Sequence, residues 1–295
     1  MFKGSYTVMV TPFKADGSLD EATLRKFVDW QIEQGTQGLI PLGSTGEFLS
    51  QTREERRRVA AIVVEQARKR VPVIVGTAAE WTQEAVAFSR EAQEVGADGV
   101  MVVPPYYSSP TPDELFEHYR RIGEALSIPI MVYNNPFTSN VDLKADLVAR
   151  LSEIDNVRYI KESSGDPHRT TRILDACGDR MTVFAGYHPW EGFRIGTKGY
   201  VSVFANIAPA LSRDLYEETV NSTDIERGWA VYRKVLPLMD AIAGDLYVGA
   251  TKAAMGLIGM PVGNPRPPRL PLPEAMLPNL RTVLSNLGLI GSRSK

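Results

Sequence analysis

Along residues 6–204, short apolar runs alternate with longer segments in which apolar residues recur at helical spacing. The short runs are rich in Val, Ile, Leu and Tyr, which is typical of strands buried on both faces. They predict strands at 6–13, 38–42, 71–76, 98–103, 129–133, 157–161, 181–185 and 200–204. The longer segments predict helices at 19–34, 52–70, 82–95, 111–125, 143–151 and 167–177.

This alternation indicates an α/β fold. A strand, a helix and a second parallel strand form a right-handed crossover, and repeated crossovers give a parallel sheet. Eight strands favour a closed barrel over an open sheet, and 295 residues exceed the roughly 250 that such a barrel needs. The pattern therefore predicts a (β/α)8 TIM barrel.

The alternation stops near residue 211, and amphipathic segments of helical length follow at 224–244, 248–258 and 274–287. Each has an apolar face, so we expect these helices to pack on the barrel and to contribute to subunit contacts. The predicted organisation is a barrel catalytic domain of residues 1–222 with a C-terminal three-helix extension of residues 223–295. The expected assembly is a homo-oligomer, either a tetramer or a dimer.

Charge and composition narrow the class of partner. The formal net charge is −2, from 33 Lys and Arg against 35 Asp and Glu, so we expect neither a nucleic-acid nor a membrane partner. The single Cys177 excludes an intramolecular disulfide and a cysteine-rich zinc site, which fits a reducing compartment. Residues 1–4 lead directly into the first predicted strand and leave no room for a leader, so we expect a cytoplasmic protein.

Lys161 is the candidate nucleophile. It ends the apolar run 157–161, and a lysine at the end of a buried strand can lose solvent and so have a pKa below about 10.4. A neutral amine attacks ketones to form a Schiff base, whose protonated imine acts as an electron sink for bond cleavage. The alternative is a lysine that merely caps its strand with its ammonium in water.

Other polar groups follow neighbouring strands at the barrel end where active sites lie. Small and hydroxylated residues occupy 43–47, aromatic residues follow at 104–107, and 133–136 and 186–188 end two further strands. These segments are distant in sequence, but the carboxyl ends of barrel strands converge on one mouth. A lysine among several tyrosines and hydroxyls at that mouth indicates an active site.

These segments resemble the dihydrodipicolinate synthase and N-acetylneuraminate lyase family of Schiff-base barrels. The matching motifs are Gly-Ser-Thr-Gly-Glu at 43–47, the tyrosine pair 106–107, Tyr-Asn with a following proline at 133–136, and Lys-Glu-Ser-Ser-Gly-Asp at 161–166. Residues 255–259 and 270–272 are also typical of the family. Each motif alone is weak, but the set in this order is specific.

The resemblance implies a role for each catalytic candidate. Lys161 would form the imine with pyruvate or another 2-oxo acid, and Tyr133 would shuttle protons beside it. Ser44, Thr45 and Gly46 would hold the substrate carboxylate through hydroxyls and backbone N–H groups. The alternative for Ser44 and Thr45 is that they only cap a helix.

Two further contacts are implied by the same resemblance. Tyr107 would extend the relay from Tyr133 through Ser44, reaching in from a neighbouring subunit, and the main-chain carbonyl of Val203 would face the site. The alternative for Tyr106 and Tyr107 is that they are only aromatic residues at the rim.

One position departs from the family. Synthases that bind aspartate semialdehyde carry an arginine five positions beyond the tyrosine, and here that position is Thr138. A hydroxyl cannot replace the bidentate charge of a guanidinium, so Thr138 would meet a different substrate. The loop of Gly186 and His188 also lacks the aspartate of sialate lyases. His188 would touch a hydroxyl or carboxylate of a shorter substrate, unless it is a surface histidine.

The sequence therefore predicts a lyase acting on pyruvate or a 2-oxo acid, most simply a 2-oxo-3-deoxy sugar acid aldolase or dehydratase. The alternative is 4-hydroxy-tetrahydrodipicolinate synthase, which Thr138 disfavours, and an alternative of another class is a non-catalytic 2-oxo acid binding protein. No cofactor is expected, because no Gly-x-Gly-x-x-Gly follows a strand. No metal is expected, because His118, His168 and His188 lack ligand spacing.

Overall fold

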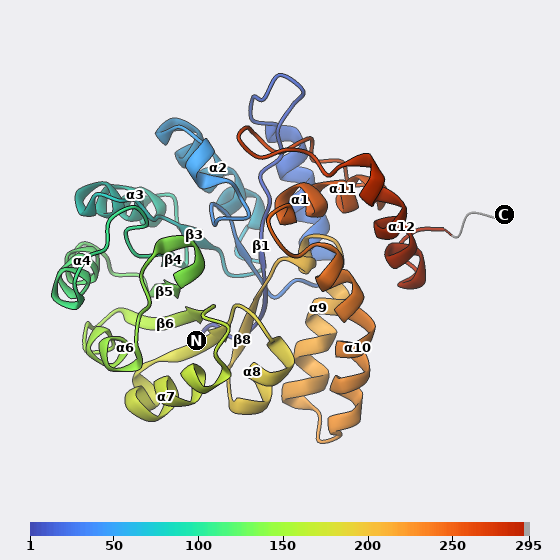
Figure 1. The fold of residues 1–295 in the computed structure, drawn as a ribbon. Helices are drawn as coiled ribbons and strands as arrows, with labels where there is room; N and C mark the ends of the chain where they lie inside the picture. Colours follow the sequence, from blue (N-terminus) through green and yellow to red (C-terminus); the bar gives the residue numbers. More distant parts are fainter. Residues whose placement is uncertain (292–295) are drawn as a thin grey trace. The chain divides into compact units, whose positions relative to one another are not determined.

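A computed structural model describes residues 1–291 and contains eight parallel strands in one sheet, ordered β2-β1-β8-β7-β6-β5-β4-β3 (Figure 1). The strands are β1 (Gly4–Val8), β2 (Gly38–Ile40), β3 (Ile74–Gly76), β4 (Gly99–Val102), β5 (Ile130–Asn134), β6 (Val157–Glu162), β7 (Thr182–Ala185) and β8 (Gly199–Ser202). All eight overlap the predicted runs. The (β/α)8 TIM barrel is confirmed.

Helices follow the strands. They are α1 (Glu21–Glu33), α2 (Arg53–Ala67), α3 (Thr82–Glu94), α4 (Pro112–Glu124), α5 (Pro136–Ser139), α6 (Ala145–Leu151), α7 (Pro167–Cys177), α8 (Pro189–Ile195), α9 (Pro209–Tyr216), α10 (Ile225–Ala241), α11 (Tyr247–Leu257) and α12 (Leu277–Asn286). The sequence did not predict α5, α8 or α9. Each begins with a proline at its first position and has at most eight residues, too few to establish a helical period.

The chain divides into two compact units, which we describe separately. Unit 1 comprises Met1–Gly4 and Pro72–Val201, and unit 2 comprises Ser5–Val71 with the chain from Ser202 onward. The predicted boundary between a barrel of residues 1–222 and an extension of residues 223–295 stays a prediction.

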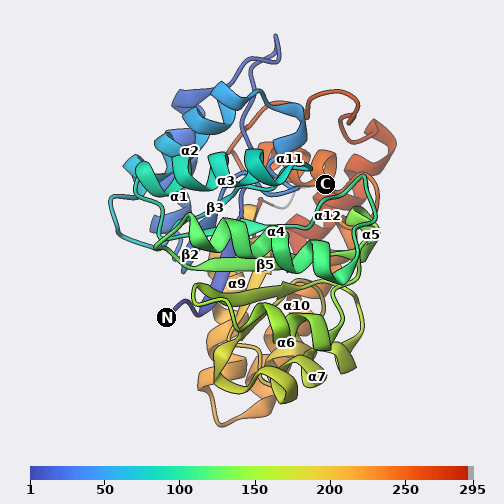
Figure 2. The ribbon, with the colours of Figure 1, turned by 90° about the vertical axis from the view of Figure 1, so that its left-hand side faces the viewer.

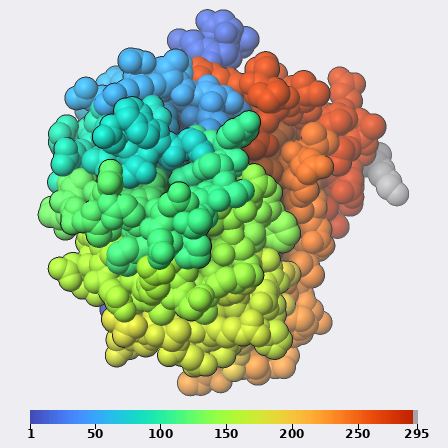
Figure 3. All heavy atoms as spheres, turned by 60° about the vertical axis from the view of Figure 1, so that its left-hand side comes forward, coloured from blue at the N-terminus to red at the C-terminus, as the bar shows by residue number. Residues whose placement is uncertain are grey.

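Unit 1 contains the strands that carry the candidate lysine and tyrosine. Every residue of β3, β4 and β5 is buried, as expected for strands covered on both faces. On its outside, α3 contacts α4, α4 contacts α6, and α6 contacts α7 (Figure 2). The space-filling view shows these helices as successive bands from teal to yellow (Figure 3).

Unit 2 pairs β1 with β2 and contains α1 packed on α2. The three helices predicted at the C-terminus are present as α10, α11 and α12, and α12 contacts both of the others. No helix within residues 1–291 combines the length and the apolar character needed to span a bilayer.

Candidate active site

The register between β5 and β6 places two pairs of residues side by side. Tyr133 is opposite Lys161, and Asn134 is opposite Glu162. Successive side chains of a strand point to opposite faces, so the first pair shares one face and the second pair shares the other. Contacts agree with this, because the Lys161 Nζ lies 3.9 Å from the centre of the Tyr133 ring.

Lys161 is buried, with 6% of its surface exposed. Burial disfavours the charged ammonium and lowers the pKa of Lys161 from its usual 10.5 to about 7. A substantial fraction of the amine is therefore neutral near physiological pH. This is the state that a Schiff-base nucleophile requires.

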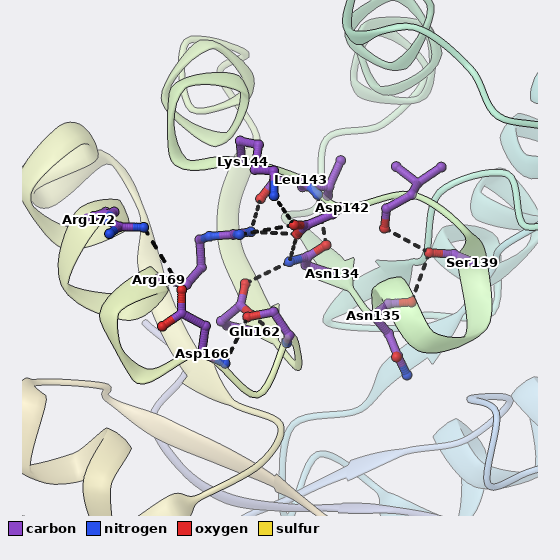
Figure 4. Close-up of polar contacts among 12 residues, drawn as sticks. Asn134, Asn135, Ser139, Asp142, Leu143, Lys144, Glu162, Asp166, Arg169 and Arg172 are labelled. Carbon is purple, nitrogen blue, oxygen red and sulfur yellow. Dashed lines mark hydrogen bonds and ion pairs between the residues drawn. The ribbon is translucent and has the colours of Figure 1, made fainter.

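The opposite face of β5 and β6 carries a polar network (Figure 4). The Asn134 Nδ2 donates to Glu162 at 2.9 Å and to Asp142 at 3.2 Å, while the Asn134 Oδ1 accepts the backbone N–H of Leu143 at 2.9 Å. Arg169 binds Asp142 through both terminal nitrogens, at 2.5 and 3.0 Å. The network ties the ends of the two strands to α7 and so fixes the register that brings Lys161 to its tyrosine.

Hydrogen bonds and burial shift the pKa values of the two carboxyl groups in this network, those of Asp142 and Glu162. The Arg169 guanidinium lowers the pKa of Asp142 well below its usual range. Burial raises the pKa of Glu162. The backbone N–H of Ser164 donates to its carboxylate at 2.6 Å and acts in the opposite direction, but burial is the larger effect. A bidentate arginine pair of this kind gives orientation as well as energy.

Glu80 organises the loop after β4. Its carboxylate accepts the backbone N–H groups of Tyr106, Tyr107 and Ser108 at 2.8 to 2.9 Å. The Tyr107 side chain is 87% exposed in the single chain. Its predicted reach into a neighbouring subunit stays a prediction.

The loop after β7 approaches β6 closely. A Cβ added at Gly186 would lie 1.7 Å from the Ser163 Oγ and 2.9 Å from the Glu162 carbonyl oxygen, so this position requires glycine. His188 is exposed and lines a small recess that Glu162 also lines. Thr138, in α5, is exposed as well, and its Oγ1 lies 3.5 Å from the carbonyl oxygen of Asn135.

In unit 2, the loop after β2 has a fixed conformation. The Gly46 carbonyl accepts hydrogen bonds from Thr11 and Gln51, each at 2.7 Å, and Thr45 is buried. Glu47, which follows in the left-handed conformation, forms a fully buried ion pair with Lys252 at 2.7 Å. The loop that carries Ser44, Thr45 and Gly46 is therefore rigidly anchored within its unit.

Val203 also belongs to unit 2. Its carbonyl oxygen accepts two hydrogen bonds from Asn206, one from the backbone N–H at 3.1 Å and one from the side-chain amide at 2.8 Å. A carbonyl has two lone pairs, so a substrate contact at this oxygen would compete with Asn206.

Within unit 1, the structure thus brings together Lys161 and Tyr133 and leaves Tyr107, Thr138 and His188 exposed. Sequence reasoning assigned no role to Asn134, Asn135 or Glu162. Asn134 and Glu162 each stand one residue after a candidate catalytic residue, and this spacing was a signal that they share the opposite face. The partners Asp142 and Arg169 had no such signal.

The chain matches a known protein family over almost its whole length. The sequence profile of the Dihydrodipicolinate synthetase family matches residues 1–287. A 4-hydroxy-tetrahydrodipicolinate synthase from Syntrophus aciditrophicus (strain SB) is 39% identical over 293 residues, covering 99% of this chain and 100% of the relative. Another, from Acidiphilium cryptum (strain JF-5), is 38% identical over 292 residues, covering 98% of this chain and 100% of the relative.

A solved structure has the same fold. The dihydrodipicolinate synthase from Acinetobacter baumannii complexed with pyruvate superimposes with a TM-score of 0.95 at 34% identity, covering 98% of this chain and 100% of that chain. Matches of this extent show that the chain belongs to the dihydrodipicolinate synthetase family, as its motifs predicted, and that it is a lyase of the class I aldolase type.

Proposed function

We propose that Lys161 forms an imine with the keto carbon of pyruvate. The observation that carries this proposal is a buried lysine with a pKa of about 7, whose amine lies 3.9 Å from the centre of the Tyr133 ring. The neutral amine adds to the carbonyl carbon, water leaves, and a protonated imine forms. Loss of a proton from the adjacent methyl group then gives an enamine, the carbon nucleophile for an aldol reaction.

The first candidate for the second substrate is aspartate semialdehyde. Relatives at 38–39% identity over nearly the whole chain are named 4-hydroxy-tetrahydrodipicolinate synthase, and this supports condensation of pyruvate with that aldehyde. These names favour the condensation over the sugar acid reaction that the sequence alone predicts.

Thr138 supports a second candidate. The loop 137–140 has no cation, so a second carboxylate would find no bidentate partner at this position. A 2-oxo-3-deoxy sugar acid carries hydroxyl groups instead, which a threonine hydroxyl can bind. Cleavage or dehydration of such an acid would use the same Lys161 imine.

The remaining assignments are part of the proposal. Ser44 and Thr45, with the backbone of Gly46, would bind the carboxylate of the 2-oxo acid, because hydrogen bonds to the Gly46 carbonyl hold this loop in a fixed conformation. The Gly46 N–H donates to the Gly43 carbonyl at 3.0 Å and would share its hydrogen with the carboxylate. Gly186 and His188 would contact the distal part of the substrate.

We also propose a cytoplasmic homo-oligomer, a tetramer or a dimer. Large apolar side chains are exposed in unit 1, among them Trp81 at 64% and Tyr107 at 87%, and a subunit contact would cover such groups. Tyr107 would then extend the proton relay across that contact.

The identity of the second substrate can be tested at Thr138. If this position excludes aspartate semialdehyde, the wild type should condense it with pyruvate only at background rate and should turn over a 2-oxo-3-deoxy sugar acid. Thr138→Arg should then gain weak condensation, because a charged hydrogen bond contributes roughly 1.5–3 kcal/mol. The measurement is a coupled condensation assay beside a panel of sugar acids.

Phe137→Arg is the matched control, since it adds the same charge one residue earlier on an exposed side chain. It should not gain condensation. Efficient condensation by the wild type would instead establish the synthase reaction and show that a cation elsewhere binds the second carboxylate.

A further inference from the structure

Asn135 contacts the candidate proton shuttle directly. It lies two residues beyond Tyr133, just after β5, and this spacing returns its side chain to the face that carries Tyr133. The Asn135 Nδ2 donates a hydrogen bond to the Tyr133 hydroxyl at 2.8 Å. Asn135 is 4% exposed, so water does not compete freely for this contact.

The backbone of Asn135 is held from the other side. Its carbonyl oxygen accepts hydrogen bonds from the backbone N–H and the hydroxyl of Ser139, at 3.1 and 2.9 Å. Figure 4 shows the Asn135 side chain pointing away from the network of Asn134 and Glu162. The amide is therefore directed at Tyr133 by a fixed main chain.

The side chain of Asn135 carries a buried polar atom that lowers the stability of the fold. Within residues 1–291, its Oδ1 is buried and has no hydrogen-bond partner. A buried carbonyl without a partner destabilises a fold, and an apolar side chain of similar size would avoid that cost. Exceptions of this kind concentrate at functional sites.

We infer that Asn135 is a positioning residue that holds the Tyr133 oxygen for proton transfer at the carbon next to the Lys161 imine. This inference rests on the proposed function. The amide N–H occupies one lone pair of the phenol oxygen, so the hydroxyl proton points elsewhere. The same N–H stabilises negative charge on that oxygen when the proton has left.

Proton transfer from the methyl group converts the protonated imine into the enamine. One C–H bond of the pyruvate methyl group breaks, and its electron pair forms the carbon–carbon double bond of the enamine. The electrons of the imine double bond move onto the nitrogen, which becomes neutral. The Tyr133 oxygen, as phenolate, takes the proton, becomes a phenol and passes the proton on to water.

The test is exchange of the pyruvate methyl protons with D2O, followed by NMR, because it needs the imine and the shuttle but no second substrate. Asn135→Leu should slow exchange roughly 5- to 10-fold, the effect of losing one hydrogen bond. In the Tyr133→Phe background, the same substitution should have no further effect, since Asn135 acts through the hydroxyl. Asn221→Leu, at an exposed asparagine, is the control and should leave exchange unchanged.

Asn135→Asp keeps the size of the side chain and replaces the donor by an anion. It should also slow exchange and should shift the rise of the exchange rate with pH to higher pH, because a carboxylate disfavours the phenolate that takes the proton. Thermal unfolding of each variant separates these effects from loss of fold.

The outcomes distinguish two failures. If the wild type exchanges the methyl protons, and folded Asn135→Leu and Asn135→Asp exchange them at the wild-type rate, only the positioning role is overturned. Equal slowing by Asn135→Leu in the wild-type and Tyr133→Phe backgrounds would also overturn it. If the wild type neither exchanges the methyl protons nor forms a borohydride-trapped adduct, the proposed function fails, and the role of Asn135 fails with it.

Discussion

Lys161→Arg is expected to reduce turnover by roughly 10⁴-fold or more, the scale seen when a covalent nucleophile is removed. An arginine keeps the positive charge but cannot lose its proton near neutral pH, so it cannot attack a ketone. The measurement is steady-state turnover of the accepted substrate. Lys198→Arg is the matched control, because Lys198 is exposed, and it should retain full activity.

The pH dependence follows from the same residue. The pKa of folded Lys161 is about 7, and its usual value is 10.5, so the folded state binds fewer protons than the unfolded state between these values. The contribution of Lys161 to the free energy of unfolding therefore rises with pH across this window. Imine formation needs the neutral amine, so its rate should rise with pH with a midpoint near pH 7. A midpoint near 10 would show that Lys161 is not desolvated in solution.

Tyr133→Phe should slow turnover by about 10²-fold or more, the usual scale for a positioned acid or base. The ring remains to pack against Lys161, so the variant should keep its fold and its borohydride-trapped adduct. Only the hydroxyl is lost, together with its hydrogen bond from Asn135. Turnover and thermal unfolding, measured on the same preparation, check both parts.

Tyr119→Phe is the control for loss of a buried phenol. Its hydroxyl donates to the Val102 carbonyl at 3.0 Å and so has a backbone partner, and the variant should lose about 1 kcal/mol of stability and no activity. Unchanged turnover in Tyr133→Phe would show that the Tyr133 ring only fills the mouth of the barrel.

The sequence was most informative where burial dictated the residue types. Strands β3, β4 and β5 are buried throughout, so their apolar runs were unmistakable. Lys161 was recognisable because it interrupts such a run at the end of β6. The helices α5, α8 and α9 were missed because they are short and depend on tertiary contacts rather than on a repeating apolar face.

Side-chain pairing was beyond the sequence. Nothing in the sequence joins Asp142 to Arg169, and their bond exists because α7 packs against α6. In the sequence, Tyr133, Asn134 and Asn135 form one polar run. The strand geometry places Asn134 and Asn135 on opposite faces. Asn134 therefore binds Glu162, and Asn135 binds the Tyr133 hydroxyl.

The most direct test of the Lys161 imine is borohydride trapping. The wild type is incubated with pyruvate, reduced, digested and examined by mass spectrometry. We expect a stable carboxyethyl adduct on the peptide that contains Lys161, and no adduct in Lys161→Arg. An adduct at another lysine, such as Lys198 or Lys252, or none at all in the active wild type, would contradict it.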